Sequence, residues 1–459
     1  MEQTHDARNN TKEATSISWS QSIKDWWRSS SKLQRPYNSQ IDLTQDLLKN
    51  RIIEYELFRK VLSQDILLVS PQSGEQDLPN CQFLGKFIDT KINDLFVIHE
   101  FCLQANSPID GQEQHLVIIH GYMAALGYFV TNLEPLIKQN RNLVIHVIDL
   151  PGFGNSSRPK FPSHLLVNHD DKLQQINQII EIENWFIDNI EKWRKLRNID
   201  HFKLIGHSMG AYLSCCYLLK YNTRENGNPV DHVMLVSPMG TESSSVSLIN
   251  HQNLQFNHHG STNDPLQEFP LIDDERLQDL QPIWQKIGKP KFPTNSILKF
   301  LWEHNLSPFR ILQYLGPFFS KFLSIGSFKR FRHLPDKSFI LKLHHYSYSI
   351  FSQYPYSGEI AITKLVNHEI LARLPLCDRG LVEHFVENNV YNIWLYGDKD
   401  WMNDQGGLNI VDKIKSFNKD LTAYKIIDNA GHHIYLDNSD LFVKCCIEYL
   451  HLESDKKLV

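Results

Sequence analysis

Residues 202–211, F-K-L-I-G-H-S-M-G-A, decide the fold because they join strand-forming residues to a helical run through one tight turn. Gly206 and Gly210 flank Ser208 on this strand-to-helix turn. Side chains at the two glycine positions would collide with neighbouring elements on such a strained turn. The sequence therefore predicts that the Ser208 hydroxyl is presented at the end of a strand as a nucleophile.

Strands and helices alternate on both sides of this turn. Short β-branched and aromatic runs bounded by turn residues predict strands, and apolar residues with helical periodicity predict helices. The predicted strands lie at 95–101, 116–119, 143–150, 202–205, 233–236, 393–396 and 424–427, and the predicted helices at 173–196, at 211–221 and from residue 441. Such alternation indicates an α/β fold with a mostly parallel sheet wrapped by helices.

The alternation stops between residues 241 and 385, where a polar stretch is followed by aromatic, helix-like segments. A chain of 459 residues is long enough for a core with an insertion. We therefore expect a largely helical cap inserted after the sixth strand of the core. The predicted division is an N-terminal extension at 1–75, partly disordered and mobile to about residue 40, a first core part at 76–240, the cap at 241–385 and a second core part at 386–459.

A histidine is expected late in the chain, because a serine hydroxyl is a weak nucleophile until an imidazole takes its proton. Gly431-His432-His433 follows the last predicted strand and supplies the imidazole. His432 is favoured over His433, since it directly follows the glycine that lets the loop bend over the sheet.

The acid that orients this histidine is expected after the preceding strand, in Y-G-D-K-D-W at 396–401. Asp400 is favoured because it lies three residues past the glycine and has room to turn back toward the histidine. Asp398 is expected to be a turn residue, and Glu242 is a third candidate.

An oxyanion that develops during acyl transfer needs two backbone N–H donors. Met209, directly after Ser208, is expected to supply one of them. Tyr122, in the loop after the strand at 116–119, is expected to supply the other. His120 in the same loop is expected to brace the loop rather than to take part in chemistry.

Composition argues against several classes of function. The net charge is −5 and charges of both signs are mixed, so no nucleic-acid partner is expected. The seven cysteines lack disulfide or zinc spacing, so we expect reduced thiols. A serine nucleophile with its histidine needs neither a metal nor an organic cofactor, so none is expected. The longest apolar stretch, 116–130, is too short to span a membrane. Residues 1–35 lack the apolar region of a secretory signal and match a mitochondrial presequence only slightly.

Five motifs occur together along the chain: His120-Gly121, D-L-P-G-F-G at 149–154, G-H-S-M-G at 206–210, Y-G-D-K-D-W-M-N at 396–403 and G-H-H-I-Y-L-D at 431–437. With these motifs the chain resembles the phospholipid-directed branch of the α/β hydrolases, which includes mitochondrial cardiolipin deacylases and lysophosphatidic acid acyltransferases. The resemblance implies the α/β-hydrolase fold and the catalytic set Ser208, Asp400 and His432. It also implies a phospholipid substrate, peripheral association with an anionic membrane surface, and a mitochondrial location. One departure is Met123-Ala124-Ala125, where relatives often carry glycines.

Three functions follow from these residues and this resemblance. The first is a serine-dependent phospholipase A-type deacylase acting on cardiolipin or a related anionic phospholipid. The second is a lysophospholipid acyltransferase that uses acyl-CoA. The third is a non-catalytic lipid-binding regulator, against which an intact Ser, acid and His set argues.

Two further features leave alternatives open. His432 and Asp437 fit H-x-x-x-x-D, a spacing linked in this family to acyl transfer, but Asp437 just ahead of the last helix is expected to cap that helix. The cap segment at 289–332 is both aromatic and basic. It either packs the cap onto the core or docks on anionic phospholipid, with Lys329, Arg330 and Arg332 as the expected basic contacts.

Overall fold

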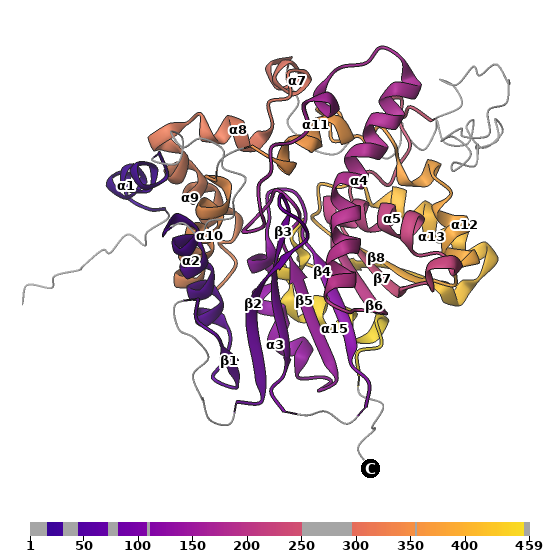
Figure 1. Ribbon diagram of the computed structural model, residues 1–459, viewed down its shortest axis with the longest axis horizontal. Helices are drawn as coiled ribbons and strands as arrows, with labels where there is room; N and C mark the ends of the chain where they lie inside the picture. Colours follow the sequence, from indigo (N-terminus) through magenta and orange to yellow (C-terminus); the bar gives the residue numbers. More distant parts are fainter. Residues whose placement is uncertain are drawn as a thin grey trace, which may run out of the picture.

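The computed structural model describes residues 16–30, 45–71, 81–107, 111–249, 296–353 and 356–453. Their centre is a nine-stranded sheet with the strand order β1-β2-β3-β5-β4-β6-β7-β8-β9 (Figure 1). β3 pairs antiparallel with both of its neighbours, and every other neighbouring pair in the sheet is parallel. The strands are β1 (Ile66–Leu68), β2 (Phe83–Lys91), β3 (Val97–Ala105), β4 (Gln114–Ile119), β5 (Leu143–Ile148), β6 (Phe202–His207), β7 (Val230–Val236), β8 (Tyr391–Gly397) and β9 (Thr422–Ile427).

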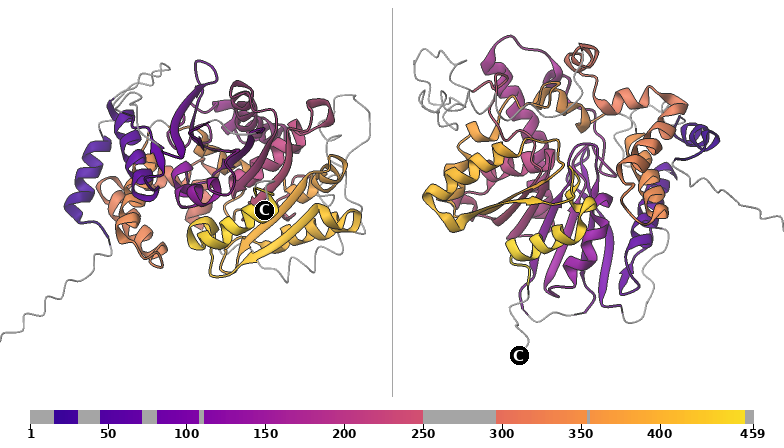
Figure 2. Two further views of the ribbon diagram at one scale, coloured as in Figure 1. Left: turned by 90° about the horizontal axis from the view of Figure 1, so that it is seen from below. Right: turned by 180° about the vertical axis from the view of Figure 1, so that it is seen from behind.

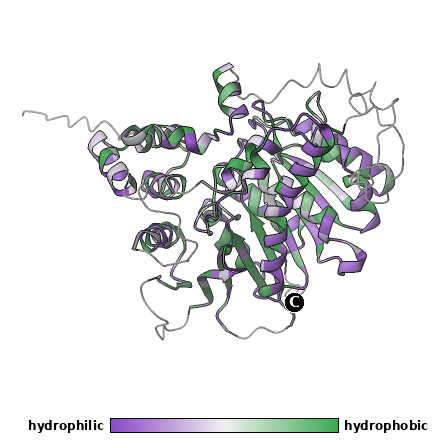
Figure 3. Cartoon of the chain, turned by 45° about the horizontal axis from the view of Figure 1, so that its top comes forward, coloured by the Kyte–Doolittle hydropathy of each residue, from purple (hydrophilic) through white to green (hydrophobic). Residues whose placement is uncertain are grey.

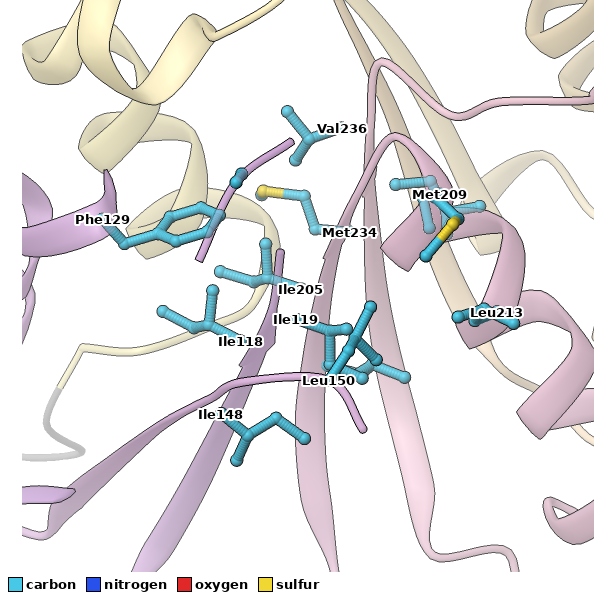
Figure 4. Packing of buried hydrophobic residues seen from close by; sticks show 14 of the residues in the cluster. Ile118, Ile119, Phe129, Ile148, Leu150, Ile205, Met209, Leu213, Met234 and Val236 are labelled. Atoms are coloured by element: carbon cyan, nitrogen blue, oxygen red, sulfur yellow. The ribbon is translucent and has the colours of Figure 1, made fainter. Parts of the chain in front are cut away.

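The central strands are apolar because helices cover both faces of the sheet. All six residues of β5, L-V-I-H-V-I, are buried, and the strands stand out as hydrophobic in Figure 3. Ile118 of β4 and Ile205 of β6 belong to the same buried cluster as Phe129, and Figure 4 shows their side chains packed together. This core holds the ends of β4, β6, β8 and β9 in fixed positions.

Helices wrap the sheet on both sides (Figures 1 and 2). On one side α3 packs against α15, and on the other side α4 packs against α5. The helices of the core are α3 (Val130–Ile137), α4 (Lys172–Leu196), α5 (Met209–Tyr221), α12 (Leu381–Glu387), α13 (Asp404–Phe417), α14 (Ile434–Asp437) and α15 (Ser439–Tyr449). The expected α/β fold with a mostly parallel sheet is confirmed. Each predicted strand and helix is present, with ends that differ by a few residues.

The described part of the predicted cap is helical. It contains α7 (Ser296–Glu303), α8 (Pro308–Gln313), the short helix η6 (Gly316–Phe318), α9 (Phe319–Arg330), α10 (Lys337–Phe351) and α11 (Ile362–Leu365). This segment follows β7, which contains the strand predicted at 233–236. β7 is the seventh strand of the sheet rather than the sixth, because β1 and β2 both precede the first strand predicted from the sequence. Residues 250–295 of the predicted cap lie outside the described residues, and the four-part division stays a prediction.

The N-terminal region differs from expectation, because it contains α1 (Trp19–Ser30) and α2 (Gln45–Val61). The prediction of a mobile segment is therefore wrong for residues 19–30. In α2, Leu57 and Phe58 are fully buried in the main core. Residues 1–15, 31–44 and 72–75 of the predicted extension lie outside the described residues, as do residues 76–80 of the predicted first core part.

Buried charges also tie α2 to the sheet. Arg51 bonds to Asp89 of β2 at 2.8 Å, and Glu54 bonds to His99 of β3 at 2.7 Å. A buried charge without its partner destabilises the folded protein. These two pairs therefore fix the position of α2 on the sheet. Among the described helices, none has the length and apolarity needed to cross a bilayer.

Candidate active site

The turn at Ser208 has the strained geometry expected from its glycines. Ser208 lies between the end of β6 and the start of α5 and has a φ of 53°, which is unusual for a residue with a side chain. A Cβ at Gly206 would lie 2.7 Å from Cα of Ala211, and one at Gly210 would lie 2.4 Å from the carbonyl oxygen of His120. Only glycine fits these two positions, so the turn can form only with this spacing.

Loops from three strands bring Ser208, His432 and Asp400 together. Nε2 of His432 lies 3.1 Å from Oγ of Ser208, and Nδ1 of His432 lies 3.1 Å from Oδ1 of Asp400. Ser208 and His432 are both nearly buried. In this arrangement the imidazole can accept the serine proton while the carboxylate fixes its tautomer and stabilises the imidazolium that forms.

The surroundings of Asp400 keep its carboxyl group ionised. Burial alone would raise the pKa of Asp400, but the charge of His432 and hydrogen bonds from His432, Ser237 and the Met402 N–H outweigh it and lower that pKa to about 2. A permanent negative charge beside Nδ1 favours a proton on that nitrogen and leaves Nε2 free to face Ser208.

The alternative acids and base lie elsewhere. Asp398 is exposed and accepts a hydrogen bond from the Ala430 N–H at 2.9 Å, as expected of a turn residue. Glu242 accepts a hydrogen bond from the Thr241 hydroxyl at 3.0 Å. His433 packs between the rings of Tyr128 and Phe331, and burial holds the pKa of His433 well below its usual value. The geometry therefore favours Asp400 and His432.

The loop after β4 lies directly beside Ser208. A Cβ at Gly121 would be only 2.7 Å from Cβ of Ser208. Met123 has a φ of 52°, so the backbone of this loop has the left-handed conformation that glycine adopts most easily. Met209 begins α5 next to the serine. The roles of the Tyr122 and Met209 amides as oxyanion donors stay predictions.

His120 braces this loop, as expected. Its Nδ1 donates to the Gly121 carbonyl at 2.8 Å, and its Nε2 accepts from the Leu150 N–H at 3.0 Å. Burial lowers the pKa of His120 to about 4, so the ring is neutral near pH 7 and can make both hydrogen bonds. The ring thereby ties the loop beside Ser208 to the loop after β5.

His207 is a positioning residue that the sequence motifs did not reveal. Its Nε2 donates to the His432 carbonyl at 2.9 Å, and the Tyr435 hydroxyl lies 3.4 Å from its Nδ1. Burial and the charge of His432 hold the pKa of His207 well below its usual value. In the sequence, His207 is marked only by its place directly before the serine in G-H-S-M-G. The motif could not indicate its role, because its partner, the His432 carbonyl, lies 225 residues away along the chain.

Asp437 does not cap the last helix, so that prediction is wrong. Asn438 caps α15 by accepting from the Leu441 N–H. The Asp437 carboxylate instead accepts hydrogen bonds from the Gly431 N–H at 2.8 Å and from both terminal nitrogens of Arg330, at 2.7 and 2.5 Å. Arg330 is the last residue of α9, so this pair joins the cap to the loop that carries His432.

Aromatic side chains from the cap and the core surround the site. Phe309 of α8 lies edge-on to Tyr122 and Phe153, with ring centroids 5.2 and 6.0 Å apart. Trp401 lies 4.6 Å from the His432 ring. These contacts place apolar surface over the loop beside Ser208, which suits an acyl chain better than a polar substrate.

Potential metal ligands cluster elsewhere in the described ranges. Three groups have ligand atoms within 4.8 Å of one another: Asp25 with His344 and His345, Glu100 with Cys102 and His146, and Glu54 with His99 and Asp149. In the latter two, the histidines already bond to carboxylates: His146 to Glu100 and His99 to Glu54 and Asp89. We therefore assign no metal to these two groups.

Comparison with known proteins agrees with this fold. Residues 114–282 match a protein family described as alpha/beta hydrolase fold. The chain is 27% identical over 335 residues to a probable 1-acylglycerol-3-phosphate O-acyltransferase of Oryza sativa, covering 71% of this chain and 64% of the rice protein. The matched part of the chain therefore spans less than two thirds of the length of the rice protein.

Two other relatives are covered more fully. The chain is 25% identical over 359 residues to the 1-acylglycerol-3-phosphate O-acyltransferase ICT1 of Saccharomyces cerevisiae, covering 73% of this chain and 81% of that protein. It is 26% identical over 334 residues to a (lyso)-N-acylphosphatidylethanolamine lipase of Bos taurus, covering 71% of this chain and 76% of that protein.

Proposed function

We propose that this chain, which has the α/β-hydrolase fold and is related to phospholipid-directed α/β hydrolases, is a serine-dependent phospholipid deacylase. The observation that carries the proposal is the chain of hydrogen bonds from Asp400 through His432 to Ser208, with 3.1 Å at each step. Aromatic rings of the cap beside this site favour an acyl-chain substrate over a small polar ester.

The reaction proceeds in two halves. His432 takes the proton from the Ser208 hydroxyl while its Oγ attacks the ester carbonyl, and the imidazolium then protonates the departing lysophospholipid oxygen. Water attacks the resulting acyl-serine, with His432 as general base, and releases the fatty acid. Asp400 stays ionised throughout and stabilises the imidazolium. The amides of Met209 and Tyr122 are the proposed donors to the oxyanion.

The proposed substrate is an anionic phospholipid such as cardiolipin, cleaved at a membrane surface. Relatives of this chain carry names for acyl transfer to acylglycerol phosphate and for lipase action on N-acylphosphatidylethanolamine. All of these names concern acyl groups on a glycerophospholipid, which supports the substrate class. A mitochondrial location is part of the same proposal, and fractionation of cells that express the full chain would test it.

Acyl transfer is the second candidate, favoured by the relatives named as acyltransferases. The same acyl-serine would then pass its acyl group to a lysophospholipid hydroxyl instead of to water. Asp437 lends this alternative little support, because Arg330 and the Gly431 N–H occupy its carboxylate. Its contacts indicate that it positions the His432 loop.

A lipid panel separates the two reactions. We expect purified protein to release free fatty acid and lysophospholipid from phospholipid vesicles with no CoA species present, because water can reach an acyl-serine without a second substrate. Products would be measured by mass spectrometry with and without acyl-CoA, and with Ser208→Ala as the blank. Strict dependence on acyl-CoA with no fatty acid release would instead establish the transferase.

The Arg330–Asp437 pair gives a further prediction. We expect Arg330→Gln and Asp437→Ala each to lower kcat for a soluble short-chain ester by roughly 3- to 30-fold, since loss of a charged partner loosens the His432 loop. Asp437→Asn should recover part of the loss, because its amide oxygen can still accept from the Gly431 N–H.

A double-mutant cycle tests whether the two residues act as a pair. The combined variant should be no slower than Asp437→Ala alone, since the interaction can be lost only once. Lys329→Gln, which changes the neighbouring exposed cation of α9, is the matched control and should stay close to wild type. Additive losses in the combined variant would show that the two residues act independently.

A further inference from the structure

Helix α1 exposes its apolar side. Trp19, Ile23 and Trp27 are spaced four residues apart, so they form one stripe along the helix. These side chains are 49, 53 and 73% exposed, respectively. An amphipathic helix on a globular protein normally buries such a stripe.

Two polar side chains of α1 face inward instead. Ser22 and Asp25 are buried against the cap, whereas Lys24 is exposed. The Ser22 hydroxyl donates to the Pro317 carbonyl at 2.6 Å and accepts from the Lys321 N–H at 2.8 Å. Asp25 accepts from the Ser320 hydroxyl at 2.6 Å. These hydrogen bonds fix the orientation of α1, so the outward direction of the apolar stripe is built into the fold.

The stripe continues onto the cap. Phe318, Phe322 and Ile325 of η6 and α9 are between 41 and 53% exposed. Trp19 contacts Phe318 and Phe322 edge-on, at ring-centroid distances of 5.9 and 6.3 Å. We call these six side chains the α1–α9 face. Figures 1 and 2 show α1 beside α9, on the side of the cap away from the central sheet.

The charge around this face is positive. The sequence from 304 to 335 contains five basic and no acidic residues. Lys24, Lys329 and Arg332 are exposed, while Asp25, the one acidic residue of α1, is buried. The whole chain has a net charge of −5, so this positive patch departs from the charge of the chain as a whole. An apolar face with basic neighbours is complementary to an anionic lipid surface.

We propose that the α1–α9 face docks the protein on an anionic phospholipid membrane, with Trp19, Ile23, Trp27, Phe318, Phe322 and Ile325 entering the lipid interface. This inference rests on the proposed function and deepens it by assigning the membrane-binding surface. Aromatic side chains suit the depth of the lipid headgroups, and nearby cations attract an anionic leaflet.

The face lies close to the catalytic loop through α9. Phe322, Ile325 and Lys329 occupy the exposed side of α9, and Arg330 at its end holds Asp437. One helix therefore joins the docking face to the loop that carries His432. A membrane bound at this face would meet the protein at the cap that overlies Ser208.

The structure changes the docking expected from the sequence alone. Within the segment at 289–332, Trp302, Phe309 and Phe319 are buried, so these three side chains pack the cap onto the core rather than contact lipid. Arg330 is paired with Asp437 and is therefore unsuitable as a membrane contact in a test. Lys24 of α1 takes its place, and residues 289–295 lie outside the described residues.

Vesicle flotation tests the proposal with the full chain carrying Ser208→Ala, so that lipid is not consumed. The vesicles contain phosphatidylcholine alone or with about 30 mol% phosphatidylglycerol, enough to give an anionic surface. The apolar variant carries Ile23→Ser, Trp27→Ser and Phe322→Ser, and its matched control carries Leu196→Ser and Phe417→Ser, which change exposed apolar residues elsewhere.

We expect the apolar variant to bind anionic vesicles at least about tenfold more weakly than its control. The basic variant, Lys24→Gln with Lys329→Gln and Arg332→Gln, should bind them roughly 10- to 100-fold more weakly at low salt and with less salt dependence. Its control changes Lys192, Lys415 and Lys419 to Gln. Equal binding by both variants and their controls would overturn the proposal.

Two measurements distinguish membrane docking from self-association and from damage to the active site. Light scattering gives the mass of the protein in solution. If the parent chain is a dimer and the apolar variant is a monomer, a second copy of the chain covers the α1–α9 face. That result would also overturn the proposal. Hydrolysis of a soluble short-chain ester, measured with Ser208 intact, should be unchanged in both variants. If the parent protein does not hydrolyse the soluble ester, the proposed function is contradicted. The vesicle-binding measurement would still test the docking face by itself.

Discussion

Replacing Ser208 with alanine is expected to lower phospholipid turnover by about 10⁴- to 10⁶-fold, because Ser208 supplies the hydroxyl that forms the acyl-enzyme. The Ser208 Oγ lies 3.1 Å from Nε2 of His432 at a turn where the backbone itself is strained. The measurement is the rate of fatty acid release, together with labelling by a fluorophosphonate probe. Both should disappear in this variant while the melting temperature changes little.

Ser214→Ala is the matched control for this experiment. Ser214 is a buried serine of α5, and its hydroxyl donates to the Gly210 carbonyl at 2.7 Å. Its loss removes one hydrogen bond but no reacting group, so turnover should stay within roughly threefold of wild type. Turnover retained by the Ser208 variant would end the serine-hydrolase proposal.

Asp400→Asn should have the second largest effect, a loss of roughly 10³- to 10⁴-fold in kcat. The Asp400 carboxylate accepts from Nδ1 of His432, and the low pKa of Asp400, about 2, keeps it negative at any working pH. An amide at this position can donate to Nδ1, which would place the histidine proton on Nε2. His432 could then no longer take the proton from Ser208.

Asp398→Asn is the control for Asp400→Asn, because it makes the same change of charge two residues earlier in the chain. Asp398 is exposed and bonds to the Ala430 N–H, so its loss should leave kcat close to wild type. Both variants would be compared on the same soluble ester, with the kcat of wild type as reference. A larger loss for Asp398→Asn than for Asp400→Asn would mean that the other carboxylate orients the histidine.

Local patterns allowed much of the fold to be predicted. Strand and helix propensities repeat over short windows, so the elements around Ser208 could be placed to within a few residues. Helix α2 was harder to predict, because its buried apolar residues are matched to partners elsewhere in the chain. In α2 the buried residues Leu57 and Phe58 pack against a core that only the complete sheet provides.

The sequence by itself determined the turn at Ser208, because this turn depends on neighbours within a few residues. The alternation of strands and helices along the chain indicated the mostly parallel sheet, and the motifs that follow its strands gave the order of serine, acid and histidine. Only the tertiary structure decided how the polar groups pair. It joined Arg330 to Asp437 across 107 residues, His207 to the His432 carbonyl across 225, and a polar side chain of α1 to the cap across 295. Such pairings arise when the packed core brings distant loops together, and no short window of sequence records the identity of a distant partner.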